Sequence, residues 1–252
     1  MEFNKISSFL AAVGIIFWIL MSAGCATPGP ARSIETISPP PPEAAATAGW
    51  WSAQFRIHWP AEEPVEWHWD LLIADKIVAP VLLQYNDAIR LWRFHRRAVR
   101  DETGHQFSFI FYASAETAYR IFNQMRANEL LVEMRYAGVI NEDRYDNPEN
   151  NTRPRIEDTS DAGWPEAIQK SWPYYIMGAS QLWLNLVRET VADMPRVYSP
   201  LSLHENEQQY KKVTAIVDDL WEKEAQHALL HHLGAMFGYK PILFHEKRML
   251  KF

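Results

Sequence analysis

Residues 91–114 have the sequence LWRFHRRAVRDETGHQFSFIFYAS, and this stretch decides the fold class that we expect. Residues 91–99 and residues 106–113 are both rich in aromatic and aliphatic side chains, in short runs typical of β-strands. The polar segment between them, RDETGH, contains Gly104 and predicts a turn. Together these segments predict a β-hairpin.

The segments on either side of the hairpin predict one more strand and two helical regions. Residues 54–59 alternate apolar and polar side chains, which indicates a strand. Residues 70–89 carry apolar side chains at helical spacing, and we expect a kink or a break at Pro80 because proline lacks an amide hydrogen. After the hairpin, a serine-capped helix is expected over residues 114–128, and a second piece over residues 129–138.

The order of these elements predicts an α+β fold, with a ferredoxin-like split βαββαβ sheet and additional packed helices. The last strand of the sheet is expected in residues 241–250, PILFHEKRML. The additional helices are expected over residues 173–193, with Pro173 in the first turn, and over residues 205–238. Residues 141–163 are polar and contain two prolines, which predicts a long surface loop.

One part of this pattern is similar to a known family. Residues 67–114, from WHWDLL to FIFYAS, resemble the small C-terminal domain of lantibiotic dehydratases. In that family, too, a helix precedes a strand rich in Phe, Arg and His, and a hairpin partner follows. The resemblance implies a fold and no activity.

The overall composition is that of a globular protein with no strongly basic region. The chain has 252 residues, of which 48% are hydrophobic and 22% charged, and its net charge is −6. This balance argues against a general nucleic-acid binder. The 11 tryptophans are expected mainly in the core. A single cysteine excludes an internal disulfide and the spaced cysteine sets of structural metal sites.

The N-terminal segment indicates export. Residues 9–21 form an uncharged apolar run of thirteen residues. As a helix this run would span about 20 Å, less than the ~30 Å of a bilayer core, and it fits the hydrophobic region of a signal peptide. Ser22-Ala23-Gly24-Cys25 follows and resembles the lipobox of bacterial lipoproteins, with Ser22 where a large aliphatic residue is usual. The alternatives are an ordinary signal peptide or an uncleaved N-terminal anchor.

The lipoprotein resemblance implies that the protein is located in the bacterial cell envelope. It implies cleavage before Cys25 and lipidation of Cys25 with acyl chains such as palmitate, which anchor the protein in the membrane. Ala26 in place of Asp implies the outer membrane, with the protein facing the periplasm. Six prolines in the next segment predict a tether. We therefore expect a lipoprotein signal peptide over residues 1–24, a Pro/Ala-rich tether over 25–49, and a single α+β domain over 50–252.

The hairpin carries the densest group of cationic side chains. In a strand over residues 91–99, Arg93, His95 and Arg97 share one face, while Arg96 lies on the other. With His105, these residues form a candidate partner- or anion-binding site, because guanidinium groups bind carboxylates and phosphates in a forked geometry. The candidate ligands are peptidoglycan carboxylates, lipid phosphates or an acidic envelope protein. The alternative is a face that is solvated or paired with the protein's own carboxylates.

Two further groups contain histidine. Glu224, His227 and His231 recur along one helical face and could bind a transition metal such as zinc or iron. The alternative is a polar helix flank, and we expect no other cofactor. His68 lies between Trp67 and Trp69, so these rings could stack on a sugar. We prefer the interpretation in which both rings point to the core and His68 lies at the surface.

These observations support two hypotheses. The first is a non-enzymatic, lipid-anchored periplasmic domain that binds an envelope protein, peptidoglycan or another envelope component. The second is an envelope hydrolase that uses histidine and carboxylate residues, with or without a metal. The chain contains no Gly-x-Ser-x-Gly nucleophile motif and no glycine-rich phosphate loop. We therefore assign no catalytic residue from the sequence.

Overall fold

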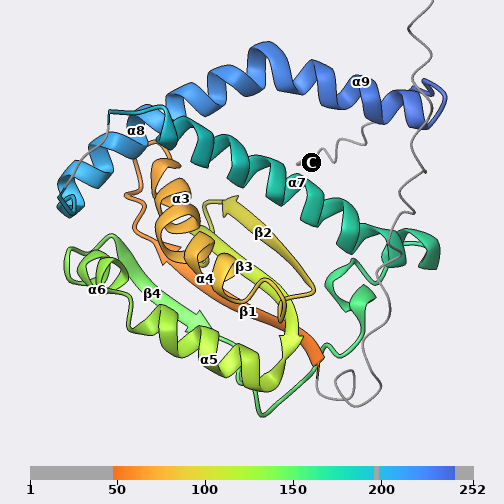
Figure 1. Cartoon of the computed structure of the whole chain (residues 1–252), viewed down its shortest axis with the longest axis horizontal. Coiled ribbons are helices and arrows are strands. Elements are labelled where there is room, and N and C mark those ends of the chain that lie inside the picture. Colours follow the sequence, from red (N-terminus) through yellow and green to blue (C-terminus); the bar gives the residue numbers. More distant parts are fainter. Residues whose placement is uncertain (1–47, 196–198, 242–252) are drawn as a thin grey trace, which may run out of the picture. The chain divides into compact units, whose positions relative to one another are not determined.

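The computed structural model describes residues 48–195 and 199–241, which form a four-stranded antiparallel sheet with helices packed on one face (Figure 1). This arrangement confirms the predicted α+β class. The order in the sheet is β2-β3-β1-β4. Every neighbouring pair is antiparallel, as the split βαββαβ order requires. The strands are β1 (Ala48–Ile57), β2 (Leu91–Ala98), β3 (His105–Ser114) and β4 (Ile140–Tyr145).

The predicted hairpin is formed by β2 and β3. Trp92 pairs with Phe111 and Phe94 with Phe109, so aromatic side chains face one another across the two strands. Gly104 has a φ of 66°, a conformation that glycine adopts without steric strain. The turn is therefore specified locally, by one glycine between two strand-forming segments.

The first crossover, between β1 and β2, is helical, and its hydrogen bonding changes from α-helical to π-helical and back. It consists of α3 (His68–Leu72), the π-helical segment η1 (Ile73–Val78) and α4 (Ala79–Gln84). Pro80 lies in the first turn of α4, immediately after the π-helical segment. We expected a kink or a break at Pro80; the structure shows a change from π-helical to α-helical hydrogen bonding next to it, within a chain that stays helical from His68 to Gln84.

The second crossover, between β3 and β4, contains α5 (Ala115–Arg126) and α6 (Glu129–Tyr136). The hydroxyl of Ser114 accepts a hydrogen bond from the backbone N–H of Thr117, which confirms the predicted cap. Gly138 then has a φ of 73° just after α6 ends. Both helices therefore begin or end where the sequence indicated.

The fourth strand was assigned to the wrong segment. β4 has the sequence INEDRY and pairs with β1, although we expected residues 141–163 to be a loop. β4 is an edge strand with one uncovered face, so its outward residues are polar and the hydrophobic signal of a strand is weak. The expected last strand, residues 241–250, lies outside the described residues except for Pro241.

Helix α7 (Glu166–Ala192) begins earlier than expected, and Pro173 lies inside it. Proline has no N–H to donate to the carbonyl four residues earlier, which here belongs to Gln169. The hydroxyl of Ser160 donates to that carbonyl at 2.7 Å instead. A contact from outside the helix therefore satisfies the group that Pro173 leaves free.

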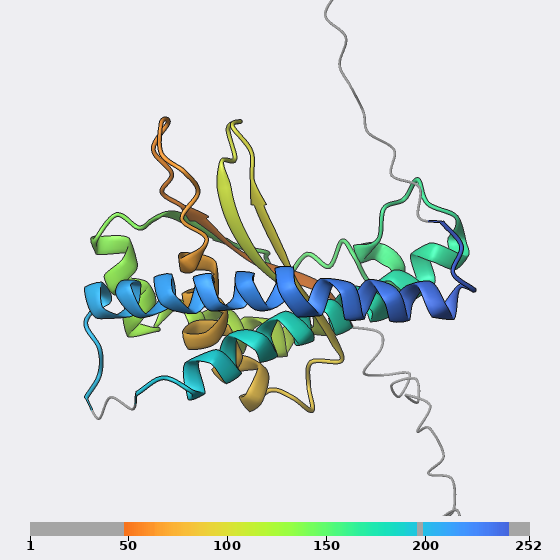
Figure 2. The ribbon, with the colours of Figure 1, turned by 90° about the horizontal axis from the view of Figure 1, so that it is seen from above.

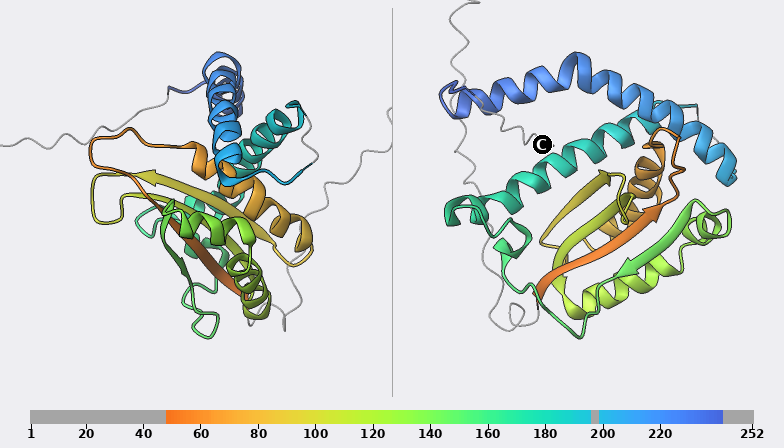
Figure 3. Two further views of the ribbon diagram at one scale, coloured as in Figure 1. Left: turned by 90° about the vertical axis from the view of Figure 1, so that its left-hand side faces the viewer. Right: turned by 180° about the vertical axis from the view of Figure 1, so that it is seen from behind.

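Helix α7 also closes one edge of the sheet. The hydroxyl of Ser180 accepts a hydrogen bond from the backbone N–H of Phe94 at 3.1 Å and donates to the carbonyl of Ile176. This contact occupies an N–H on the outer edge of β2 that could otherwise pair with another chain. In Figure 1, α7 runs beside β2, and the right-hand view of Figure 3 shows the sheet from its other face.

The last helical region is continuous, as predicted, but only its first part is packed. It comprises α8 (Leu203–Leu220), the π-helical segment η3 (Trp221–Ala225) and α9 (Gln226–Met236), and Figure 2 shows α9 as the continuation of α8. Tyr210, Val213 and Val217 of α8 are buried, whereas no residue of α9 is. Within the described ranges, no helix has the length and apolar character needed to cross a membrane.

The core lies between the helices and one face of the sheet. Phe55, Phe107, Phe109 and Phe111 are fully buried there. The rings of Phe109 and Phe111 stack with their centroids 4.9 Å apart. Burial of each ring stabilises the fold by about 1.5–3 kcal/mol. The opposite face of the sheet carries no helix over most of its area, and it is this face that bears the site described below.

The contact between Ser160 and the Gln169 carbonyl gives a test of how α7 tolerates its proline. Ser160→Ala should lower the free energy of unfolding by about 1 kcal/mol, because it leaves that carbonyl without a protein donor. In a Pro173→Ala background the same change should cost less, because the introduced alanine supplies a backbone N–H of its own. Urea unfolding of the four proteins would measure the difference, and an equal cost in both backgrounds would contradict this explanation.

Candidate functional site

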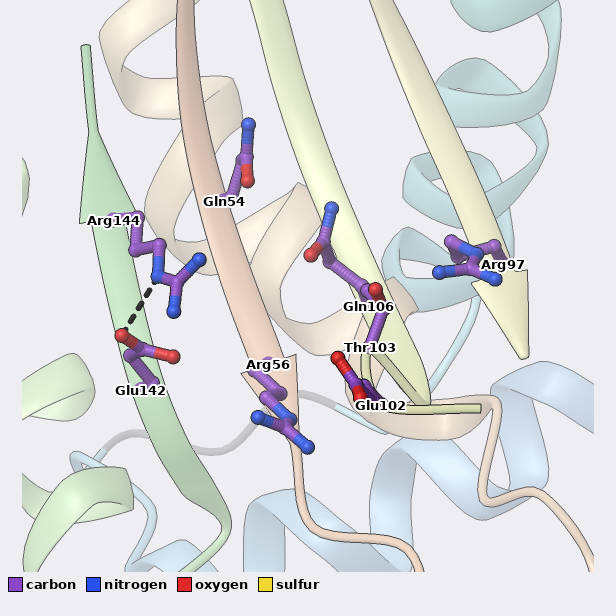
Figure 4. A pocket seen from close by; sticks show the side chains of 8 residues that line it. All are labelled: Gln54, Arg56, Arg97, Glu102, Thr103, Gln106, Glu142 and Arg144. Carbon is purple, nitrogen blue, oxygen red and sulfur yellow. Dashed lines mark hydrogen bonds and ion pairs between the residues drawn. The ribbon is translucent and has the colours of Figure 1, made fainter. Parts of the chain in front are cut away.

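The candidate site lies on the open face of the sheet, where polar side chains form two rows across all four strands. The strand register places Arg97, Gln106, Arg56 and Glu142 side by side in the first row. In the neighbouring row it places His95, Ser108, Gln54 and Arg144. Figure 4 shows that the side chains lining one hollow on this face come from all four strands and from the turn between β2 and β3.

The hollow has a volume of about 430 Å³ and a mixed charge. Arg144 is paired with Glu142 at 2.7 Å, and Arg97 with Asp101 at 2.5 Å. Arg56 has no carboxylate within ion-pair distance among the described residues. The amides of two glutamines lie between the arginines and add neutral donors and acceptors.

Arg93 extends the cationic character of this face. Its Nε donates to the hydroxyl of Thr159 at 2.9 Å, and in the described part of the chain no carboxylate pairs with it. Burial, followed by the nearby charge of Arg153, lowers the pKa of Arg93 to about 10, so Arg93 remains charged at neutral pH. An anion on this face would therefore meet a guanidinium that is not already neutralised.

His95 lies between two arginines of its own strand. Partial burial, followed by the charges of Arg93 and Arg97, lowers the pKa of His95 below its usual value. His95 is therefore neutral at pH 7 while the face is empty. A bound anion would favour its protonated form and so oppose this shift.

The other end of the open face is covered. The indole N–H of Trp50 donates to the carbonyl of Ile156, and the hydroxyl of Tyr112 donates to that of Pro154, both at 2.8 Å. These contacts hold residues 154–156, which include the first residue of the 3₁₀ helix η2 (Ile156–Thr159), against an apolar patch of the sheet. Part of the expected loop, residues 141–163, thus packs on the sheet. The uncovered area of this face is therefore limited to the end that carries Arg56, Arg97 and Arg144.

The structure divides the five predicted anion-binding residues between the two faces. Arg93, His95 and Arg97 lie on the open face, but Arg96 and His105 lie beneath the helices. The expected alternation of β2 is therefore confirmed. Sequence reasoning missed Arg56 and Arg144, and only Arg56 had a usable signal, because it falls between Phe55 and Ile57 of an alternating strand.

Arg96 and His105 both bind Asp70 of α3. The Nε of Arg96 lies 2.9 Å from one oxygen of Asp70, and the Nε2 of His105 lies 3.0 Å from the other. Asp70 is 0% exposed and His105 1%. The guanidinium of Arg96 also lies between the rings of Trp67 and Trp183, 4.8 and 4.7 Å from their centroids. This network joins α3, α7 and the hairpin, and Arg96 and His105 are already paired there with the protein's own carboxylate.

His68 was expected at the surface, and this prediction was wrong. It is only 4% exposed, because it lies in the contact between α3 and α8. Burial lowers its pKa, while the carboxylates of Glu66 and Glu207 act in the opposite direction. Ligand atoms of these three residues lie within 4.8 Å of one another.

The other predicted metal-binding group is on the unpacked helix. The rings of His227 and His231 lie 5.8 Å apart, and Glu224 belongs to the adjoining segment η3. Of the residues that the structure describes, the group whose ligand atoms converge is the one around His68, and not this one. A metal at Glu224, His227 and His231 stays a prediction. The predicted lipidation site, Cys25, lies outside the described residues.

No protein-family model matches the chain, and no curated protein or solved structure matches it either. The functional interpretation therefore depends on the geometry of the sheet face and on the N-terminal sequence.

The Asp70 network should be essential for stability. Asp70→Asn replaces the buried carboxylate that contacts both Arg96 and His105, and we expect it to lower the free energy of unfolding by about 3–5 kcal/mol. Denaturant unfolding monitored by tryptophan fluorescence would measure this loss. Asp101→Asn, which breaks an exposed pair with Arg97, is the matched control and should change stability little. Similar losses in both variants would contradict the assignment.

Proposed function

We propose that the chain is a lipid-anchored cell-envelope protein whose folded domain binds a carboxylate-bearing envelope component. The observation that carries the binding part is the open sheet face, where arginines of three strands meet around an uncovered hollow. Arg56, which lines the hollow, has no carboxylate partner among the described residues. The same is true of Arg93, which lies on this face outside the hollow and donates to Thr159 of η2. An external anion is the natural partner for such groups.

The mixed character of the hollow favours a carboxylate over a phosphate as the ligand. Glu102 and Glu142 lie beside the arginines, so a polyphosphate would meet two negative charges. A peptide that carries carboxylates together with amide and amino groups can pair with all of them. Peptidoglycan stem peptides have this chemistry, as do acidic segments of envelope proteins, and either would lie within reach of an anchored periplasmic domain.

The anchor part rests on the sequence. Cys25 follows Ser22-Ala23-Gly24 and an apolar segment, and the proline-rich segment 26–47 separates it from the folded domain, which begins with β1 at Ala48 rather than at residue 50 as expected. Two or more acyl chains on Cys25 would hold the protein stably on a membrane. The tether would allow the open face to reach material beyond the lipid surface.

Replacing the central arginines tests this function. Arg56→Gln combined with Arg97→Gln should weaken binding to purified peptidoglycan at least tenfold, because charge-assisted hydrogen bonds contribute about 1.5–3 kcal/mol each. Co-sedimentation with peptidoglycan would measure the affinity, and a parallel capture of envelope proteins would show whether an acidic protein binds instead.

Three controls separate the parts of the proposal. Arg120→Gln, on the exposed surface of α5, should leave binding unchanged. Circular dichroism should show that the double variant is folded. Cys25→Ser should release the chain from membranes and abolish acylation without affecting peptidoglycan binding. Binding by the double variant to both ligands at wild-type strength would reject the open face, and acylation of the Cys25→Ser chain would reject the anchor.

Binding should also become tighter as the pH falls. Because the pKa of His95 is lowered in the free protein and a bound carboxylate favours the imidazolium, binding takes up a proton. The affinity should therefore rise as the pH falls from about 7 to about 5, a range that includes the ordinary histidine pKa of ~6.5. The charged groups that act on His95 are Arg93 and Arg97 of the same strand, and its cross-strand partner is the neutral Ser108.

His95→Gln identifies the group responsible. Affinity measured across this pH range should rise in the parent protein and stay flat in the His95→Gln variant. A pH dependence of the same size in both proteins would assign the proton uptake to another group.

A further inference from the structure

Glu66, His68 and Glu207 gather at the place where the start of α3 meets α8. Glu66 precedes α3, His68 is its first residue, and Glu207 lies in the second turn of α8. One ring nitrogen of His68 and one oxygen of each carboxylate lie within 4.8 Å of one another. This cluster is on the helix-covered side of the sheet, away from the open face.

His68 gives an independent reason to look for a ligand here. The residue is only 4% exposed, and its Nε2 has no hydrogen-bond partner. Buried polar atoms are nearly always paired, so an unpaired one requires an explanation. A neutral imidazole beside two carboxylates is a donor set that transition metals prefer.

A positive charge already lies among these carboxylates. The Nζ of Lys211 is 2.5 Å from Glu207 and 3.8 Å from Glu66. Its side chain is 42% exposed, so the ammonium can move into solvent without loss of core packing. The indole N–H of Trp69 donates to the second oxygen of Glu66 at 3.2 Å and orients that carboxylate.

We propose that Glu66, His68 and Glu207 bind a divalent transition-metal ion of the zinc class, which displaces the ammonium of Lys211. Zinc bonds to nitrogen and oxygen ligands are about 2.0–2.2 Å long, so the three ligand atoms must draw closer together than they are without the ion. Both carboxylates are partly exposed and have rotatable side chains that allow this movement. The ion would connect α3 to α8 and leave one coordination position for water.

Zinc titration of the full-length, metal-stripped protein tests this site. We expect one zinc ion per chain by isothermal titration calorimetry and by elemental analysis, with no displacement by a large excess of magnesium. Glu207→Gln should weaken zinc binding at least tenfold while circular dichroism stays unchanged, because Glu207 is at the rim of the contact. Glu222→Gln, an exposed change further along the same helical region, is the matched control and should have no effect.

Lys211→Met separates the proposed displacement from simple surface binding. Removal of the competing ammonium should increase the zinc affinity several-fold, whereas a structural role of Lys211 alone would leave it unchanged or weaker. The His227→Ala, His231→Ala double variant should bind zinc as the parent does. Absence of zinc binding, loss of binding in the double variant, or full binding in Glu207→Gln would overturn the site, and an unchanged or weaker affinity in Lys211→Met would overturn the displacement. None of these outcomes depends on the open face.

Discussion

The carboxylate of Asp70 is the constraint on which the rest of the fold depends. It has no contact with solvent and is paired on one oxygen with Arg96 and on the other with His105. A charge in this position is tolerated only where both oxygens are satisfied, because an unpaired buried carboxylate costs several kcal/mol. The first crossover helix is therefore fixed in one position relative to the hairpin. Trp183 of α7 packs on the same guanidinium and places a third element.

This arrangement determines which face of the sheet is available. The helices that meet at Asp70 cover one face, and the alternation of β2 sends Arg96 to that face and Arg93 and Arg97 to the other. Neighbouring residues of one strand thus have two different roles. The inner arginine holds the fold together, while the outer arginines lie on the open face, where we propose that an anion binds.

The predictions that succeeded depend on residues close together in the chain. The hairpin, the Ser114 cap and the helix end at Gly138 each follow from a few neighbouring residues, and each is present. The two main errors had distant causes. β4 is polar because Glu142 and Arg144 lie on the uncovered face and Asp143, on the other face, pairs with Arg135 of α6. Its pairing with β1 defines it as a strand. Pro173 lies inside α7 because Ser160, from outside the helix, satisfies the carbonyl that proline leaves free.

By itself the sequence determined the α+β class, the order of the first five elements and the lipobox-like segment at Cys25. These are features of periodicity, capping and composition, which depend on local chain chemistry. Only the tertiary structure decided that His105 is buried against Asp70, that Arg56 joins Arg97 in one row, and that His68 meets Glu207. Burial and ion pairing arise between segments far apart in the chain, and no local pattern of residues specifies them.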